Sequence, residues 1–335
     1  MTRAAAPPST ALATVESPVG KRFDVLGLGC AAVDDLLYVS SFPATDKKVR
    51  VARSVRRCGG LTGAALVAAA RLGVRCAYAG CLGTDEQSQH VARNFSDEGV
   101  DISFAPRLPE ARVVHSTIVV GQDSGSRNIF YEDDGMIGAH PTLPEEDVIR
   151  DTQVLFIDHL GMPGNLRAAR TARSAGVAVV ADFEDEAGPF FKEVLSLVDH
   201  LILSEEFARR ITGQPDAAQA ALALWQPARA AVVVTCGANG CWSVSAPTTV
   251  AARHHAAFPV PATDTTGCGD VFHGAYAARL ACGEPLEERI RLAAAAAAVK
   301  AMHGQIPRRS VVEAFLRANP HVGTPPAARV GNDVA

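Results

Sequence analysis

Short apolar runs alternate with alanine-rich segments along most of the chain. The runs that predict buried strands are FDVLGLG (23–29), VRCAYAG (74–80), QVLFID (153–158), VAVVAD (177–182), HLILS (200–204) and AAVVVTC (230–236). Continuous apolar strands of this length, separated by helical segments such as 61–72 and 165–175, predict a parallel sheet covered on both faces. Right-handed crossovers would make it doubly wound. A hairpin of strands 240–245 and 248–252 is expected late in the sheet.

Other segments mix polar and apolar positions, as strands do when one face of their sheet is wet. They are VRVARSVR (49–56), RVVHSTIVVG (112–121) and SRNIFYED (126–133). These segments predict a small β-sheet lid formed from about residues 35–58 and 110–133. The expected fold class is therefore α/β: a doubly wound, mainly parallel sheet with helices on both faces and a small lid.

Composition limits the classes of function. Hydrophobic residues make up 48% of the 335 residues and the formal net charge is −4, which argues against disorder and against nucleic-acid binding. No stretch reaches the roughly 18 apolar residues of a membrane span. The eight cysteines form no CxxC pair and no zinc-type cluster, so we expect reduced thiols in a cytoplasmic protein. The expected partners are small molecules.

One domain is expected to account for most of the chain. The first twenty residues are broken by prolines and lack the apolar run of a signal peptide, and the end, GTPPAARVGNDVA, has the composition of a frayed tail. We expect disordered tails at 1–20 and 324–335. The domain at 21–323 is not too long for a single α/β unit with an elaboration.

The sequence DTTGCGD (264–270) stands where a helix is expected to begin. Val271, Ala275 and Ala278 follow helical spacing, and Gly283 is a natural C-terminal stop. The first amides of a helix lack intrahelical acceptors and lie at the positive end of its dipole, and flanking glycines let an anion come close. The loop is therefore predicted to bind negative charge.

An aspartate directly after such a loop suggests proton transfer. Asp270 would take the proton of an attacking hydroxyl while the amides of Gly267, Cys268 and Gly269 stabilise a phosphoryl group in transit. The simpler alternative is that Asp264 and Asp270 cap the turn and that the glycines only make it tight, which is the commoner explanation of a lone GxGD. The motif by itself leaves both open.

DTTGCGDVFHGAYA resembles the C-terminal signature of the ribokinase-like (PfkB-type) carbohydrate kinases, DTxGAGD, with Cys268 in place of alanine. The pair Gly59-Gly60 in CGGLTGAALVAAARLG is similar to the family's N-terminal hallmark, and the resemblance spans about residues 22–320. It implies a ribokinase-like fold and ATP-dependent transfer of a phosphoryl group to a sugar hydroxyl. The phrase DTTGxGDVFHGA is similar to the sulfofructose kinase branch, so the ketohexokinase and sulfofructose kinase side of the family is favoured.

The resemblance also assigns substrate residues. Asp34 falls where relatives place the aspartate that binds sugar hydroxyls, and the Gly59-Gly60 turn closes over the sugar. Asp35 would face the other way on a strand. Lid and strand-end residues set the identity of the sugar, and the candidates are Arg112, Arg127 and Asp158. Each is explained equally well as a solvated polar residue, and either arginine would suit an anionic substituent.

Two further segments resemble the nucleotide site of the family. VTCGANGCW (234–242) is similar to VTxGxxG, which lies against the nucleotide phosphates and ribose, and AAAAVKAMHGQIP (295–307) is similar to the helix and loop beside adenine. The residues implied to contact ATP are Thr235, Gly237, Gly240, Thr265, Ala298, His303 and Gly304. A simple strand-turn-strand explains the first segment almost as well.

Departures from the family pattern bear on metal binding. Where many relatives have NxxE, linked to magnesium through water, LSEEFARRITG has Ser204 and Phe207. Glu205, or the acidic run at 181–186, is the alternative support for the Mg²⁺-nucleotide. Relatives use the first aspartate of DTxGAGD for a monovalent cation, so Asp264 is a candidate site for K⁺. Arg308 stands in the adjoining loop, where a small residue is more usual, and argues against that ion.

Other functions remain open from the sequence. Gly27, Gly29 and Ala32 match the GxGxxA of NAD-dependent oxidoreductases, but the second βαβ unit that such a fold needs does not follow. A non-catalytic sugar or nucleotide sensor on the kinase fold is a second alternative, because Ala64 replaces a sugar-contacting asparagine of many relatives. Retention of Asp270 argues for catalysis. A nucleoside is an alternative substrate.

A homodimer is also implied, because the lid often forms a dimer interface in relatives. The apolar positions Val49, Val51 and Val55 lie in the predicted lid and would suit such an interface. The alternative is that they cover the bound sugar.

Overall fold

A computed structural model describes residues 20–123, 126–186, 188–245 and 251–322. The predicted tails at 1–20 and 324–335 lie outside these residues, apart from Gly20, and so does most of the predicted strand 248–252. The remaining predicted elements can be compared directly with the fold.

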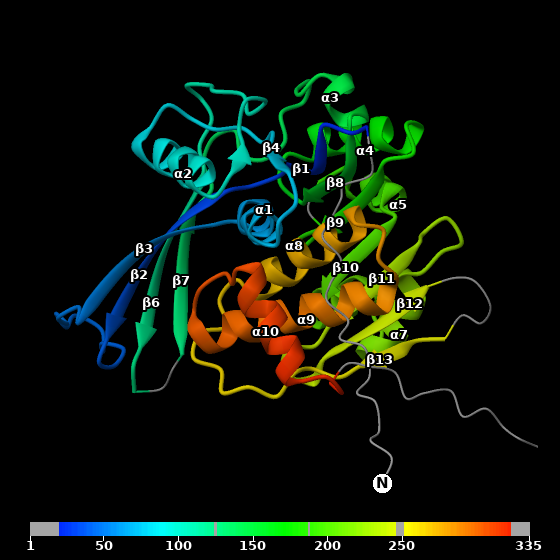
Figure 1. Ribbon diagram of the computed structural model, residues 1–335. Coiled ribbons are helices and arrows are strands. Elements are labelled where there is room, and N and C mark those ends of the chain that lie inside the picture. Colours follow the sequence, from blue (N-terminus) through cyan, green and yellow to red (C-terminus); the bar gives the residue numbers. More distant parts are fainter. Residues whose placement is uncertain (1–19, 124–125, 187, 246–250, 323–335) are drawn as a thin grey trace, which may run out of the picture.

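A large sheet forms the centre of the molecule (Figure 1). Its strands, in the order in which they hydrogen-bond, are β13 (Arg253–His255), β12 (Cys241–Ser245), β11 (Ala231–Thr235), β10 (His200–Ser204), β9 (Ala178–Asp182), β8 (Thr152–Asp158), β1 (Phe23–Leu28), β4 (Cys76–Tyr78) and β5 (Val100–Asp101). The strands from β11 to β5 are parallel, and β12 and β13 are antiparallel to their neighbours. Each predicted apolar run forms a strand of this sheet.

Helices cover both faces of the large sheet. One face carries α1 (Leu61–Arg71), α2 (Glu86–Asp97), α8 (Cys268–Ala281), α9 (Leu286–His303) and α10 (Arg309–Ala318). The other carries α3 (Glu146–Arg150), α4 (Met162–Ser174), α5 (Phe191–Leu197), α6 (Glu205–Thr212) and α7 (Ala217–Leu224). Successive residues of one strand enter opposite cores: Phe156 packs with the first set, and Leu155 and Ile157 pack with the second. This burial on both faces explains the continuous apolar runs.

A second, smaller sheet projects from the core (Figure 1). Its strands, in order, are β3 (Arg53–Gly59), β2 (Ala32–Val39), β6 (Val114–Gly121) and β7 (Arg127–Glu132). The central pair β2 and β6 is parallel, and the edge strands β3 and β7 are antiparallel to it. Half-buried and exposed residues dominate β3 and β7, which agrees with the mixed patterns of the sequence. The predicted α/β fold with a small additional sheet is confirmed.

The connection after β1 argues against an NAD-dependent oxidoreductase. β1 is followed by β2 of the small sheet, whereas a dinucleotide-binding turn must open a helix. Gly27 and Gly29 instead allow close packing, because a Cβ would lie 2.6 Å from Leu66 at Gly27 and 2.1 Å from the Thr62 hydroxyl at Gly29. The proposed GxGxxA motif is therefore wrong as a nucleotide signature.

Two bulk properties complete the description. Across the ranges given above, no helix is both long and apolar enough to cross a bilayer. All eight cysteines fall within those ranges and all are free thiols.

Candidate active site

The DTTGCGD loop opens α8 as predicted. Gly267 is the N-cap residue, and its φ of 75° lies in the left-handed region that favours glycine. The Cys268 amide donates to the Thr265 carbonyl at 3.2 Å, and among the described residues no acceptor takes the amides of Gly267 and Gly269. Two backbone donors are therefore free at the positive end of a helix of fourteen residues.

Asp270 lies in the first turn of α8 at the wall of a cavity. Burial raises the pKa of its carboxyl group well above the ordinary value, and the negative charges of Asp182 and Glu184 raise it further. Its Oδ2 lies beside Gly267, 3.5 Å from where a Cβ on that glycine would be. A carboxylate of raised basicity thus stands next to the free amides.

A buried pair of side chains supports this helix start from behind. His273 Nδ1 lies 2.8 Å from the Gly269 carbonyl and 3.3 Å from Asp182 Oδ2, and Nε2 lies 3.0 Å from the Ile202 carbonyl. Burial raises the pKa of Asp182 well above its ordinary value. Both ring nitrogens are thereby engaged, and α8 is tied to the end of β9 and the middle of β10.

Asp34 reaches the same cavity from β2 in the small sheet. A Cβ on Gly59 would lie 2.4 Å from Asp34 Oδ2, and a Cβ on Gly60, whose φ is 87°, would lie 2.7 Å from the Ala31 Cα. Burial raises the pKa of Asp34, and a hydrogen bond from Ser116 opposes this rise. Steric contacts therefore favour glycine at both positions of the pair.

Asp35 has a different environment. Its two carboxylate oxygens accept from Arg56 Nε at 2.7 Å and Arg56 Nη2 at 2.8 Å, and His115 Nε2 lies 3.0 Å away. The Arg56 guanidinium lowers the pKa of Asp35 to about 2. The two neighbouring aspartates thus face opposite sides of the strand, as their alternation on a strand requires.

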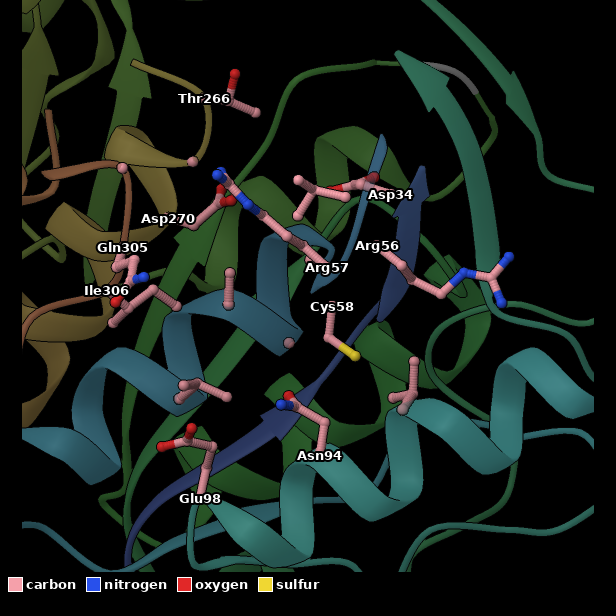
Figure 2. A pocket seen from close by; sticks show the side chains of 18 of the residues that line it. Asp34, Arg56, Arg57, Cys58, Asn94, Glu98, Thr266, Asp270, Gln305 and Ile306 are labelled. Atoms are coloured by element: carbon pink, nitrogen blue, oxygen red, sulfur yellow. The ribbon is translucent and has the colours of Figure 1, made fainter. Parts of the chain in front are cut away.

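The cavity between the small sheet, α1, α2 and the start of α8 has a volume of about 540 Å³. Figure 2 shows Asp34 and Asp270 at its upper part, with Arg57 extending from β3 toward the Asp270 side. Gly59 and Gly267 also line it, together with Lys300. The cavity therefore brings Gly59, both aspartates and the anion-binding loop into one space.

Asp158, the last residue of β8, has a different environment. Its carboxylate is fully buried and accepts from the Cys30 amide at 2.7 Å, the Thr62 hydroxyl at 2.8 Å and the Leu160 amide at 2.8 Å. These donors occupy both oxygens, so Asp158 holds the β1–β2 connection against α1 and does not line the cavity.

The two candidate lid arginines differ. Arg112 Nη1 donates to the carbonyls of Pro109 and Ala111 at 2.7 and 2.6 Å, and the residue is not among those lining the cavity. Arg127 lies on edge strand β7 and is exposed, and its charge acts on Cys268. Burial is the main cause that raises the pKa of the Cys268 thiol. Of the two arginines, Arg127 is the one whose charge influences the anion-binding loop, through Cys268.

The VTCGANG segment forms a tight turn at the end of β11. Gly237 has a φ of 56°, the Cys236 amide donates to the Gly240 carbonyl at 2.7 Å, and a Cβ on Gly240 would lie 2.0 Å from the His255 carbonyl. Thr235 ends β11, and Glu205 begins α6. Burial and the adjacent Glu205 carboxylate raise the pKa of the Cys236 thiol to about 12. Glu205 therefore lies beside this turn.

The end of α9 meets the DTTGCGD loop. Ala298 is buried in α9, His303 is exposed at its end, and Gly304 is the C-cap with a φ of 69°. Asp264 accepts from Arg57 Nη1 at 2.7 Å, and Lys300 Nζ lies 3.6 Å from the same Oδ2. Among the residues that the structure describes, no three His, Cys, Asp or Glu side chains gather as a metal site.

Sequence reasoning missed three residues of this arrangement, namely Arg57, Lys300 and His273. Arg57 stands two residues before Gly59, and a charged residue so near a functional turn could have indicated a role in the site. Lys300 is the one charged residue in the run LAAAAAAVKAMHG. A lone charge in an otherwise apolar helix indicates a buried partner, which here is Asp264.

A free helix N-terminus, a half-buried carboxylate beside it and a second carboxylate across a cavity are features that phosphoryl transfer on an α/β fold can use. Comparison with known proteins agrees. The model of the pfkB family of carbohydrate kinases matches residues 24–306, and the chain belongs to that family. It is therefore a carbohydrate kinase, and the family resemblance of its motifs is confirmed.

Individual relatives show the same similarity. The chain is 28% identical to ribokinase of Haemophilus influenzae over 86% of this chain and 97% of that protein, and 26% identical to probable fructokinase-4 of Arabidopsis thaliana over 79% and 89%. A solved structure of a putative ribokinase from Agrobacterium tumefaciens matches with a TM-score of 0.81 and 26% identity, covering 89% of this chain and 98% of that one. The fold is thus ribokinase-like.

Proposed function

We propose that this carbohydrate kinase transfers the γ-phosphoryl group of ATP to a sugar hydroxyl bound beside Asp34 and Asp270. One observation carries the proposal: Asp34, Asp270 and Gly267 line the same cavity. A hydroxyl-binding group, a base and free amides within one space are what phosphoryl transfer requires. Support for ATP comes from family membership and from the like-folded Arabidopsis thaliana ribokinase, solved with ribose and ATP (TM-score 0.78).

Asp270 acts as the base. It accepts the proton of the attacking hydroxyl as the oxygen bonds to the γ-phosphorus and the bond to the leaving ADP oxygen breaks. Its raised pKa makes it a stronger base than an ordinary carboxylate once it is ionised. The amides of Gly267 and Gly269 donate to the phosphoryl oxygens. The amide of Cys268 joins them only if it releases the Thr265 carbonyl.

Asp34 orients the sugar. Its carboxylate accepts from two sugar hydroxyls, and the Gly59-Gly60 turn leaves room for the ring. The small sheet closes over the cavity as a lid and excludes water, which would otherwise compete as the acceptor. Asp158 and Arg112 are left out of this sugar site because protein groups already satisfy them. Arg127 remains a candidate for an anionic substituent.

The nucleotide lies on the side of the loop that adjoins the VTCGANG turn and the end of α9. The residues proposed to contact it are Thr235, Gly237, Gly240, Thr265, Ala298, His303 and Gly304. Carboxylates suit Mg²⁺. Together with the phosphates, the ion would be held by Glu205 beside the turn. The alternative is that Asp182 and Glu184, near Asp270, hold it. When bound, Mg²⁺ would neutralise phosphate charge.

The test measures ADP release from ATP-Mg²⁺ with ketoses, aldoses, their acidic derivatives and nucleosides. Asp270→Asn should abolish turnover while ligand binding persists, because only the base is lost. Asp34→Asn and Asp35→Asn form a matched pair on one strand: the first should raise KM strongly and the second should leave it nearly unchanged.

The outcomes separate the alternatives. Turnover by Asp270→Asn at the wild-type rate would refute the assigned base. Binding of sugar and ATP without turnover by the wild-type protein would favour a sensor. Turnover restricted to nucleosides would correct the substrate class.

We also propose a homodimer formed through the lid. β7 is an edge strand on which Ile129, Phe130 and Tyr131 are 49%, 61% and 66% exposed. An exposed apolar edge strand of this kind is normally covered. Val49 and Val51 are also exposed and suit the interface, whereas Val55 lines the cavity and suits contact with the sugar.

Light scattering should give the mass of a dimer, and Phe130→Asp should give a monomer; a monomeric wild type would refute the proposal.

A further inference from the structure

Lys300 is buried in the wall of the cavity although it carries a charge. It lies in α9, is 5% exposed, and is surrounded in sequence by alanine, valine and methionine. Its Nζ is 3.6 Å from Asp264 Oδ2 and 3.5 Å from the Asp264 carbonyl. Burying an ammonium group is costly unless an anion compensates it, so this lysine is held by Asp264.

Asp264 is fully engaged by the protein. Its Oδ2 accepts from Arg57 Nη1 at 2.7 Å, and its Oδ1 accepts from the Thr266 amide at 3.0 Å. Burial alone would raise the pKa of Asp264, but the Arg57 hydrogen bond and the Lys300 charge outweigh it and lower the pKa. The carboxylate is therefore ionised and neutralised by two fixed cations.

This donor set does not fit the monovalent cation that the family resemblance implies. Such an ion needs several oxygen ligands free of other positive charge, whereas Asp264 Oδ2 already faces a guanidinium and an ammonium group and Oδ1 accepts from the Thr266 amide. Like charges within about 4 Å repel strongly in a partly buried site. Gly304, at the adjoining loop, lies against the same ion pair, since a Cβ there would be 3.4 Å from Asp264 Oδ2 and 3.8 Å from Arg57. The described residues leave no uncompensated anion at this position.

We propose that Lys300, with Arg57, is a built-in substitute for a monovalent cation. The two side chains hold Asp264 and thereby the loop from Asp264 to Gly267 that presents the anion-binding amides. Catalysis is then independent of K⁺. Lys300 is a positioning residue, because it acts on the phosphoryl group through Asp264 and the loop. This inference rests on the proposed kinase activity.

The first test uses the wild-type protein in KCl, NaCl and choline chloride at equal ionic strength. ADP release with the accepted sugar should agree within about twofold across the three salts, since the charge is already present. KCl and RbCl should raise the melting temperature no more than NaCl does. A K⁺-specific rise in rate of about tenfold, or a K⁺-specific thermal shift, would overturn the inference. If no sugar is turned over in any salt, the proposed function fails, and the thermal shift still reports on the ion site.

Variants of Lys300 test the role of its charge. Lys300→Ala removes the charge and opens space, and it should lower the rate about tenfold to hundredfold in choline chloride, with recovery on adding ammonium or K⁺. Lys300→Met removes the charge but fills the space, so its loss should not be recovered. Lys300→Arg should keep both the rate and the salt independence. Loss in Lys300→Ala that no cation recovers would show that the positive charge is not what Lys300 supplies. If the alanine variant does not fold, the wild-type salt comparison decides.

Discussion

Gly274 on α8 offers a sharp test of how the site is positioned. It lies one helical turn beyond Asp270, where α8 crosses α1. A Cβ at this position would lie 2.0 Å from the Ala65 carbonyl oxygen and 2.9 Å from its Cα, whereas real Cβ contacts do not fall below 3.0 Å. The obstructing atoms belong to the backbone, so no rotamer change can relieve the clash.

Gly274→Ala therefore requires α8 and α1 to move apart by about 1 Å. Overpacking of this kind costs about 1–3 kcal/mol, and the gain of about 1 kcal/mol from replacing a helical glycine offsets only part of it. Asp270 moves with α8, whereas the Gly59-Gly60 turn moves with α1. A misplacement of about 1 Å at reacting groups can cost roughly hundredfold in rate. We expect a loss of about hundredfold in kcat/KM with a modest loss of stability.

Gly269→Ala is the matched control for stability. It lies on the same helix, and a Cβ there would meet nothing within 4 Å. Urea unfolding should show Gly269→Ala to be at least as stable as the wild type and Gly274→Ala to be less stable, and ADP release would give kcat/KM for each. A Gly274→Ala protein with wild-type stability and turnover would refute the steric argument.

Two predictions concern pH. Burial and the Asp182 charge raise the pKa of Asp270, so Asp182→Asn should move the acid limb of kcat/KM to lower pH; an unmoved limb would contradict this. Burial lowers the pKa of His200 to about 3, so the unfolded chain binds more protons below about pH 6.5 and stability is lost as pH falls through that window. His200→Gln should lose about 2 kcal/mol less than the wild type between pH 7 and pH 5 in urea unfolding; equal losses would contradict this.

The sequence predicted the large sheet because a strand buried on both faces must be apolar throughout. The runs at 153–158 and 200–204 therefore matched β8 and β10 closely. The small sheet was predicted from its mixed pattern, but its central strand β2 was not separately delimited. AVDDLLYV carries two adjacent aspartates, which are unusual in a strand, and only the pairing with β3 and β6 makes the pattern intelligible.

The sequence could not decide the roles of polar residues whose partners lie far away along the chain. Asp158 at a strand end is equally suited to a ligand or to a buried structural role, and the donors that decide the matter, Cys30 and Thr62, lie 128 and 96 residues away. The same holds for Lys300, whose partner Asp264 is 36 residues earlier. Motif spacing can bring such residues to one edge of a sheet, but it cannot show which polar atoms satisfy one another.

Two glycine contacts fix the distance between the proposed base and the proposed sugar-binding carboxylate. Asp34 rests on Gly59, which leads through Gly60 into α1, and α1 packs through the Ala65 backbone on Gly274 of α8, the helix that carries Asp270. The Arg57–Asp264 ion pair is a second connection between the same two parts, from β3 to the loop before α8. A side chain at Gly274 would push α8 and α1 apart, because its contact is with the Ala65 backbone, whereas a side chain at Gly59 would displace the Asp34 carboxylate. The backbone contact at Gly274 therefore sets the separation of α8 and α1, and the ion pair holds the small sheet to the loop that precedes α8.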